Sequence, residues 1–229
     1  MNSTSPVALI LGQGANVGKS VAGAFAKNGY RIALVARRLR EEDSTARELH
    51  VKGDLSDPES IPAIFATVKA KFGLPPSVVV YNASAGAPNA KNDPLALPLE
   101  QFQRDFAINT TSAFMAAKHA ALAFAELPAA AARTFIFTGN CTNVTPIGIL
   151  LDGGVGKSAT AHIIQVAAEA YKDKGFKFYY ADERKADGSP VYNAIDGEAH
   201  GEMYTELAKG ATQGPWSQTF VKGVSYKKF

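Results

Sequence analysis

The stretch VALILGQGANVGKSVAGAF, residues 7–25, holds an apolar run, a glycine-rich turn and a second apolar run. The first run is typical of a β-strand buried on both faces, and the second is long enough for a helix. A glycine-rich turn at a helix N-terminus binds phosphate groups, because free N–H groups and the helix dipole face the anion. The fold therefore depends on which kind of phosphate turn this is.

A nucleoside-triphosphate loop is one alternative, because the turn ends in Gly-Lys-Ser at 18–20 and the same tripeptide returns at 156–158. Such a loop requires another glycine five residues before the glycine of this tripeptide. The residues at those positions are Gln13 and Leu151, so both candidates fail. The pattern therefore excludes a triphosphate loop at either place.

A dinucleotide turn fits the same stretch better. Gly12 follows the first apolar run directly and permits a tight turn, while Gly14 and Gly18 let the phosphates and the helix come close to the backbone. The spacing Gly-x-Gly-x-x-x-Gly is one residue longer than the standard fingerprint. By itself it is a weak signal for a dinucleotide coenzyme.

Two arginines after the second apolar run add specificity. An NAD-binding chain carries an acidic residue at the end of this strand, whereas residues 31–38 here end in Arg37 and Arg38. Guanidinium groups match a 2′-phosphate, which a carboxylate would repel. The sequence thus predicts NADP as the coenzyme, with a solvated basic loop as the alternative reading.

Short β-rich runs alternate with helix-like runs along the chain. The runs expected as strands cover residues 7–11, 31–36, 49–53, 77–82, 134–138, 176–181 and 219–223. Between them lie helix-like segments at 17–29, 58–73, 99 to about 127, 156–175 and 198–210. Repeated strand–helix–strand units force parallel strands with helices on both faces. We expect one doubly wound, Rossmann-type α/β domain over 1–229 with about seven parallel strands, and a substrate-side loop and short helix at 182–215.

Composition limits the possible partners. Hydrophobic residues make up 46% of the chain and charged residues 20%, and the net charge of +3 is too small to indicate nucleic acid. No apolar run is long enough to span a membrane. The single cysteine, Cys141, fits a reducing compartment, so a cytoplasmic location is expected. The four histidines are not spaced as a ligand cluster, so no metal is expected.

The motifs, in this order, resemble those of the short-chain dehydrogenase/reductase family over roughly residues 6–181. The family opens with Thr-Gly-x-x-x-Gly-x-Gly, which residues 11–18 follow with Asn16 in place of the middle glycine. An aspartate after the third strand matches Asp54, and the family's Asn-Asn-Ala-Gly matches 81–84. The resemblance implies a coenzyme site made of Gly12, Gly14, Asn16, Val17, Gly18, Arg37, Arg38, Asp54, Leu55, Asn82, Ala83 and Lys157.

The catalytic part departs from the family pattern of Ser followed by Tyr-x-x-x-Lys. The resemblance places the lysine at Lys157, the tyrosine position at Gly153 and the serine position at Asn140. The family's helix asparagine, which helps to relay protons, matches Asn109. Residues 181–184 stand where the family has Pro-Gly. The resemblance therefore implies a divergent branch that lacks the usual Ser and Tyr.

The missing phenol leaves the proton donor open. Lys157 can still bind ribose hydroxyls and Asn140 can still bind a carbonyl group, but Gly153 offers no proton. Asp152 can replace the phenol only if residues 152–154 are not helical, since in a regular helix Asp152 points about 140° away from Lys157. Three other candidates near the expected substrate mouth are more typical of packing residues: Tyr180, Tyr192 and Tyr204.

Two functions are compatible with these motifs. The first is an NADP-dependent oxidoreductase of atypical mechanism that acts on a small organic carbonyl, imine or alcohol. The second is a non-redox or regulatory NADP-binding protein on the same scaffold, because fold alone does not fix function. The segments 106–124 and 156–172 are apolar around most of their circumference, which predicts a homodimer or homotetramer. The alternative to an oligomer is that the C-terminal segment of the same chain covers these apolar helix faces.

Overall fold

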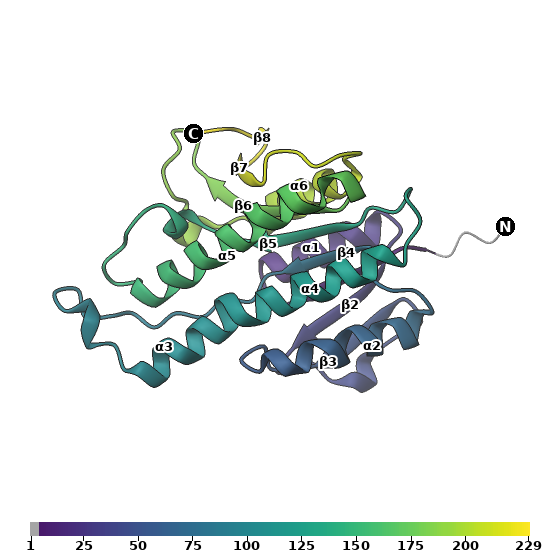
Figure 1. Cartoon of the computed structure of the whole chain (residues 1–229), viewed down its shortest axis with the longest axis horizontal. Helices are drawn as coiled ribbons and strands as arrows, with labels where there is room; N and C mark the ends of the chain where they lie inside the picture. Colours follow the sequence, from purple (N-terminus) through teal and green to yellow (C-terminus); the bar gives the residue numbers. More distant parts are fainter. Residues whose placement is uncertain (1–4) are drawn as a thin grey trace.

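The computed structural model describes residues 5–229, in which eight strands form one sheet of order β3-β2-β1-β4-β5-β6-β7-β8 (Figure 1). Strands β1 to β7 are parallel, and β8 pairs antiparallel with β7. The strands are β1 (Val7–Leu11), β2 (Arg31–Ala36), β3 (Glu48–Lys52), β4 (Val78–Tyr81), β5 (Thr134–Thr138), β6 (Lys177–Arg184), β7 (Ser217–Val221) and β8 (Ser225–Tyr226). The expected doubly wound α/β fold is confirmed.

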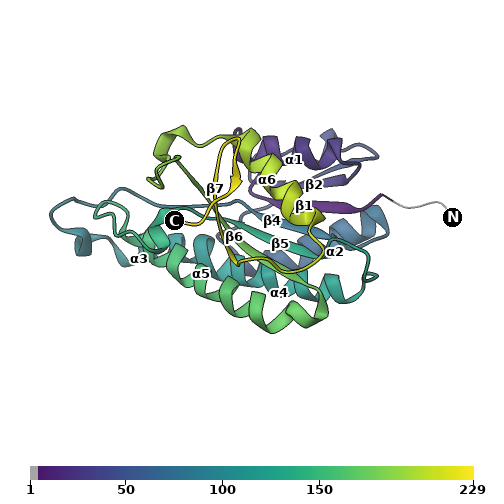
Figure 2. The ribbon, with the colours of Figure 1, turned by 90° about the horizontal axis from the view of Figure 1, so that it is seen from above.

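Helices cover both faces of this sheet. They are α1 (Val17–Lys27), α2 (Ile61–Phe72), α3 (Leu99–Phe106), α4 (Ser112–Ala125), α5 (Leu151–Tyr171) and α6 (Gly197–Lys209). Seen from above, α1 and α6 lie on one face, and α2, α4 and α5 lie on the other (Figure 2). Two buried apolar clusters follow from this arrangement, one under each layer of helices.

The strand order reverses between β1 and β4, which pair side by side although the chain visits β2 and β3 between them. All five residues of β1 and all four of β4 are buried, which explains why both runs are apolar without alternation. Ligands of open α/β sheets bind at such a switch point, outside the carboxyl ends of the strands. The glycine turn after β1 lies at this place.

Two expected element boundaries were wrong. Residues 182–184 were expected in a loop, but they continue β6, because β7 pairs with β6 from Tyr180 to Arg184. Helix α5 begins at Leu151 instead of residue 156, so the Asp-Gly-Gly segment is helical. Packing does not require either glycine, since a Cβ at Gly153 would meet nothing within 4 Å and one at Gly154 would make an ordinary contact, 3.6 Å from the Thr142 carbonyl oxygen.

The segment from 99 to 127 is not one regular helix. A five-residue π-helical turn, Ala107–Thr111, separates α3 from α4. Such turns occur inside α-helices, frequently at functional sites. Here the turn carries Asn109, whose side chain is fully buried.

Helices α1 and α6 pack against each other through glycines. A Cβ at Gly197 would lie 2.6 Å from the Ser20 Oγ, and one at Gly201 would lie 2.9 Å from the Ala24 Cβ. The same side of α6 buries Met203 and Tyr204. The short helix expected beside the substrate mouth is therefore also part of the core.

The same substitution at two glycines of this helix pair is expected to have opposite effects. Gly23 lies in α1 with nothing within 4 Å of an added Cβ, so Gly23→Ala should raise the free energy of unfolding by about 0.5–1 kcal/mol. Gly201→Ala should lower it, because overpacking a core costs about 1–3 kcal/mol. Urea unfolding followed by circular dichroism measures both changes. Stabilisation by Gly201→Ala would contradict the close contact.

Candidate functional site

A cavity of about 280 Å³ opens at the carboxyl ends of the first four strands. It brings together seven of the residues that the sequence suggested for a coenzyme, namely Gly12, Gly14, Arg37, Asp54, Leu55, Asn82 and Ala83. The other wall is formed by residues on β2 and by Ile108 in the π-helical turn. These seven of the twelve predicted coenzyme residues therefore meet in space at the switch point of the sheet.

The glycine turn is held tightly against the end of β4. Gly12 has a φ of +99°, and an added Cβ there would lie 2.5 Å from the Ala83 nitrogen. The Asn82 side chain donates a hydrogen bond from Nδ2 to the Gly12 carbonyl oxygen at 2.8 Å. These contacts require a glycine at position 12 and fix where the turn begins.

The later residues of the turn differ in what surrounds them. A Cβ at Gly18 would lie 2.8 Å from the Gly12 carbonyl oxygen, so this glycine lets α1 approach the turn. Val17 is buried in the core under α1. Gly14 has no neighbour within 4 Å of an added Cβ, which leaves open space next to its backbone. This space at the N-terminus of α1 suits an anionic group.

The two arginines are not equivalent. Both are exposed, but Arg37 lines the cavity and Arg38 is outside its lining. The Ser56 N–H donates to Asp54 Oδ1 at 3.0 Å and, together with the charge of Arg37, holds the pKa of Asp54 below its ordinary value. The cavity thus contains one cation and one carboxylate at the ends of β2 and β3.

Asn16 departs from the expected arrangement. Its side chain contacts the N-terminus of α6, where Nδ2 donates to the Ile195 carbonyl oxygen at 2.9 Å and Oδ1 accepts from the Gly197 N–H at 3.1 Å. Asn16 is outside the lining of the cavity. The expectation that this residue binds coenzyme can therefore apply only to its backbone.

Lys157 lies in α5 and is almost fully buried, with 3% of its surface exposed. Its Nζ donates to the Thr138 carbonyl oxygen at 2.8 Å and lies 4.5 Å from the centroid of the Phe137 ring. Burial lowers the pKa of Lys157 to about 8, and the negative charge of Asp182 opposes this shift. One turn earlier, an added Cβ at Gly153 would meet nothing within 4 Å, so open space lies next to the lysine's helix.

Asn109 holds the loop that follows β4. Its Oδ1 accepts from the Ala85 N–H at 3.0 Å and its Nδ2 donates to the Ala85 carbonyl oxygen at 2.6 Å. Helix α5 comes close at this point, since a Cβ at Gly156 would lie 2.6 Å from the Asn109 Cβ. Both polar atoms of this side chain are therefore occupied by the protein itself.

Asn140 is exposed just beyond β5, and Tyr180 of β6 fixes its backbone. The Tyr180 hydroxyl donates to the Asn140 carbonyl oxygen at 2.7 Å and accepts from the Asn140 N–H at 3.1 Å. A Cβ at Gly139 would lie 2.1 Å from the Tyr180 ring. The Asn140 Oδ1 accepts from the N–H and the hydroxyl of Thr142. Among the hydrogen bonds of residues 5–229, none uses the Asn140 Nδ2, so it is available as a donor.

The three tyrosines considered as acids occupy different environments. Tyr180 and Tyr204 are fully buried, and burial raises the pKa of both above the ordinary value. The Tyr204 hydroxyl donates to the Thr138 Oγ1 at 2.8 Å. Tyr192 is 61% exposed. The two buried phenols are thus held in hydrogen bonds with the protein.

Asp152 does not meet the condition for replacing a phenol. It lies in the first turn of α5 and is buried, and its Oδ2 accepts from the Ala87 N–H at 3.3 Å. Because residues 152–154 are helical, its carboxyl group is directed away from Lys157. The suggestion that Asp152 is a proton donor beside Lys157 is corrected on this ground.

The sequence did not reveal that Asp152 contacts a second carboxyl group, Asp105 of α3. Both residues are 1% exposed, and the Gln101 Nε2 donates to the Asp105 Oδ2 at 2.7 Å. Burial raises the pKa of Asp105, and its hydrogen bond with Asp152 adds to this effect. Two carboxyl groups in contact cannot both be ionised at low cost, so the pair favours a proton on Asp105 to a higher pH than an isolated aspartate would.

Asp182 is a second polar residue that the sequence reasoning missed. It is buried near the end of β6, and the Arg184 Nε and Nη2 contact its Oδ2 at 2.7 and 2.6 Å. Burial raises the pKa of Asp182, while the hydrogen bond and charge of Arg184 oppose the shift. Charged residues at the end of an apolar run are typical of a loop, but Asp182 and Arg184 are two residues apart, so in a strand they lie on the same face and can pair.

Comparisons with known proteins agree with this fold. The sequence model of a family described as enoyl-(acyl carrier protein) reductase matches residues 12–178. A short chain dehydrogenase/reductase, dmxR12 of Cryptosporiopsis sp., is 47% identical over 99% of this chain and 96% of that protein.

Solved structures resemble the fold along most of the chain. A 3-oxoacyl-[acyl-carrier protein] reductase from Brucella melitensis has a TM-score of 0.78 at 20% identity, with 91% of this chain and 92% of that chain covered. A metagenomic short-chain oxidoreductase in complex with NADP has a TM-score of 0.77 at 20% identity, with 94% and 98% covered. Within residues 5–229, no helix combines the length and the apolar character needed to cross a membrane.

The carboxyl pair predicts a pH dependence of stability. Because the pKa of Asp105 is raised in the folded state, its contribution is complete below about pH 4, the ordinary pKa of an aspartate, and is lost as the pH rises through the folded-state pKa. Asp105→Asn should remove this loss. The free energy of unfolding of the variant, relative to the wild type, is therefore expected to increase as the pH rises from about 4 through the folded-state pKa of Asp105.

Urea unfolding at a series of pH values measures this difference. Glu100→Gln is a matched control, since it removes an exposed carboxyl group from the same helix. The pH profile of Asp105→Asn is compared with the profile of this control. A flat profile for Asp105→Asn would show that the pair does not hold a proton.

Proposed function

The chain belongs to the short-chain dehydrogenase/reductase family, and we propose that it is an NADP-dependent oxidoreductase of atypical mechanism that acts on a small organic carbonyl, imine or alcohol. The observation that carries this proposal is the cavity at the switch point, where open space beside Gly14 meets the N-terminus of α1 and the guanidinium of Arg37. Those groups suit a diphosphate and a 2′-phosphate.

The residues present fit this coenzyme. The N-terminus of α1 would hold the diphosphate, Arg37 the 2′-phosphate, and Asp54 with Leu55 the adenine side of the cavity. Lys157 donates one hydrogen bond to Thr138, which leaves further donors of the ammonium for ribose hydroxyls. When bound, NADPH supplies a hydride.

Asn140 would orient the substrate. Its Nδ2 is free to donate to a carbonyl oxygen, while Thr142 fixes its Oδ1 and Tyr180 fixes its backbone. The amide thus takes the role that a serine hydroxyl has in the family. Because its backbone is fixed in this way, the donor is oriented before substrate arrives.

The site lacks a phenol at the position of Gly153. General acid catalysis typically contributes about 10²- to 10⁴-fold, so the proposed substrates are carbonyls or imines that accept hydride readily, or alcohols that donate it readily. Asp152 faces Asp105, and the hydroxyls of Tyr180 and Tyr204 are engaged. We therefore assign the proton to water in the space at Gly153 or to the substrate itself.

A non-redox or regulatory NADP-binding protein is the second candidate. The observation in its favour is the same open space at Gly153, where the chain has no acid. A protein of this second kind would bind NADP in the cavity but would not transfer a hydride to or from it. The two candidates differ in whether NADPH is consumed.

Arg37→Ala is expected to weaken NADPH binding roughly tenfold and to leave NADH binding unchanged, because only NADPH has the 2′-phosphate. Isothermal titration calorimetry measures both affinities. Arg38→Ala is the matched control, since Arg38 is exposed but does not line the cavity. Equal affinity of the wild type for the two coenzymes would refute the NADP proposal.

Gly153→Tyr tests the space beside Lys157. Oxidation of NADPH is followed by absorbance with a panel of small carbonyls and imines. A Cβ at this position meets nothing within 4 Å, and the phenol beyond it would occupy the open space, so turnover of the substrates used by the wild type should fall. A gain in carbonyl reduction would instead identify a reductase that lacks only its acid. No oxidation by either protein would favour the non-redox candidate.

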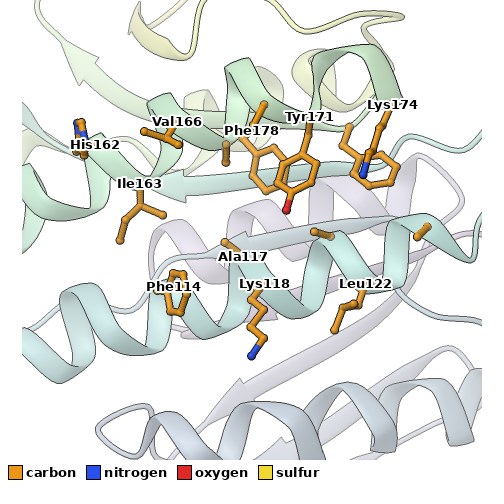
Figure 3. Close-up of a pocket in the computed structure, with 15 residues that line it drawn as sticks. Phe114, Ala117, Lys118, Leu122, His162, Ile163, Val166, Tyr171, Lys174 and Phe178 are labelled. Atoms are coloured by element: carbon orange, nitrogen blue, oxygen red, sulfur yellow. The ribbon is translucent and has the colours of Figure 1, made fainter.

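We also propose a homo-oligomer, formed through the groove between α4 and α5. This groove has a volume of about 710 Å³ and is lined by apolar side chains of both helices (Figure 3). Phe114, Leu122 and Val166 in it are 47%, 57% and 54% exposed. An apolar face of this kind marks an interface.

The alternative cover, the C-terminal segment, lies elsewhere. Lys227 contacts Ala186 and Thr219 at the β7 edge of the sheet, away from α4 (Figure 1). The groove therefore remains free for a second copy of the chain. This placement supports the oligomer over an intramolecular cover.

Val166→Asp is expected to convert the oligomer into a monomer, because burying an unpaired carboxylate in the interface would cost the hydration free energy of its charge. Light scattering at micromolar concentration should give two or four times the 24.2 kDa of one chain for the wild type and 24.2 kDa for the variant. Val144→Asp, at a 72% exposed position in the loop before α5, is the control. A monomeric wild type would refute the proposal.

A further inference from the structure

One side chain joins the phosphate turn to the segment that follows β6. The Asn16 amide donates to the Ile195 carbonyl oxygen and accepts from the Gly197 N–H, at 2.9 and 3.1 Å. The partners are 179 and 181 residues away along the chain. Both polar ends of the side chain are used, so the contact has a defined geometry.

The site of this contact is shaped for it. A Cβ at Gly197 would lie 2.5 Å from the Asn16 Oδ1, so only glycine lets the amide approach. Asp196 N-caps α6 by accepting from the Ala199 N–H at 2.9 Å, and its own N–H donates to the Glu183 Oε2 at 2.8 Å. The amide of Asn16 thus meets a helix N-terminus that is itself held in place.

Asn16 faces two regions at once. Its backbone is the N-cap of α1, next to the space where a diphosphate would bind. Its side chain is directed to the end of residues 185–196, which connect the carboxyl end of β6 to α6. Ligands of such sheets bind beneath these connections. One residue therefore touches both the coenzyme turn and the substrate-side loop.

We propose that Asn16 is a positioning residue that couples coenzyme binding to the order of the loop 185–196. This inference rests on the proposed binding of NADP. A diphosphate at the N-terminus of α1 restrains the Asn16 backbone, and the amide transmits this restraint to Ile195 and Gly197. Since such coupling is reciprocal, a substrate that orders the loop also strengthens coenzyme binding.

Hydrogen exchange measured by mass spectrometry tests the coupling. The probe is ADP carrying a 2′-phosphate, which ends at the diphosphate and has no nicotinamide with which to touch the loop directly. In the wild type it should slow exchange of the amides in 192–197 about five- to tenfold, the factor of one ordinary hydrogen bond. In Asn16→Gly, which carries the residue typical of the family, the probe should leave this exchange unchanged.

Asn28→Gly is the matched control. Asn28 lies at the other end of α1, and its Nδ2 donates only to the Ala24 carbonyl oxygen, at 2.9 Å. This variant should respond to the probe as the wild type does. Without the probe, Asn16→Gly should already exchange the Gly197 amide faster than either protein, because its acceptor is gone.

Calorimetry on the same samples shows whether the probe binds, and so distinguishes failure of the proposed coenzyme from failure of the proposed coupling. If the probe does not bind the wild type, the proposed coenzyme and the coupling both fail. If it binds without slowing exchange in 192–197, or slows it equally in Asn16→Gly, the coupling alone is overturned. Protection that is present in the wild type and absent in Asn16→Gly establishes it.

Discussion

The contact between the end of β1 and the end of β4 is the constraint on which the rest of the site depends. Gly12 can turn there only because it has no Cβ to meet the Ala83 nitrogen, and the Asn82 side chain closes the contact. This junction sets where the cavity opens and where α1 begins. A larger residue at position 12 would separate two central strands, so fold and binding site share one requirement.

Around this junction, the polar side chains that the family uses for chemistry are largely bound to the protein. Asn109 holds Ala85, and Lys157 donates to Thr138. Such contacts orient groups in advance and limit which of them can reach a ligand. The free groups are therefore few: the Asn140 amide nitrogen and the remaining donors of Lys157.

The sequence predicted what depends on local pattern. Buried strands read as continuous apolar runs, and the alternation of these runs with helix-like segments predicted the doubly wound sheet correctly. The errors came from long-range packing. Residues 152–154 form the first turn of a helix that continues to Tyr171, and β6 extends because β7 pairs with it. The direction of the Asn16 side chain depends on partners near residue 196, which no local window contains.

The Tyr180 side chain, which fixes the backbone of Asn140, also contacts the residue that dominates the protein's fluorescence. Its ring packs edge-on against Trp216 at a centroid distance of 6.5 Å, and the chain has a single tryptophan. The indole is thus one aromatic contact away from the residue that would meet the substrate. Tryptophan fluorescence, excited selectively over that of the tyrosines, therefore comes from one known position, and changes in its emission on adding a ligand can be assigned to that region without an attached dye.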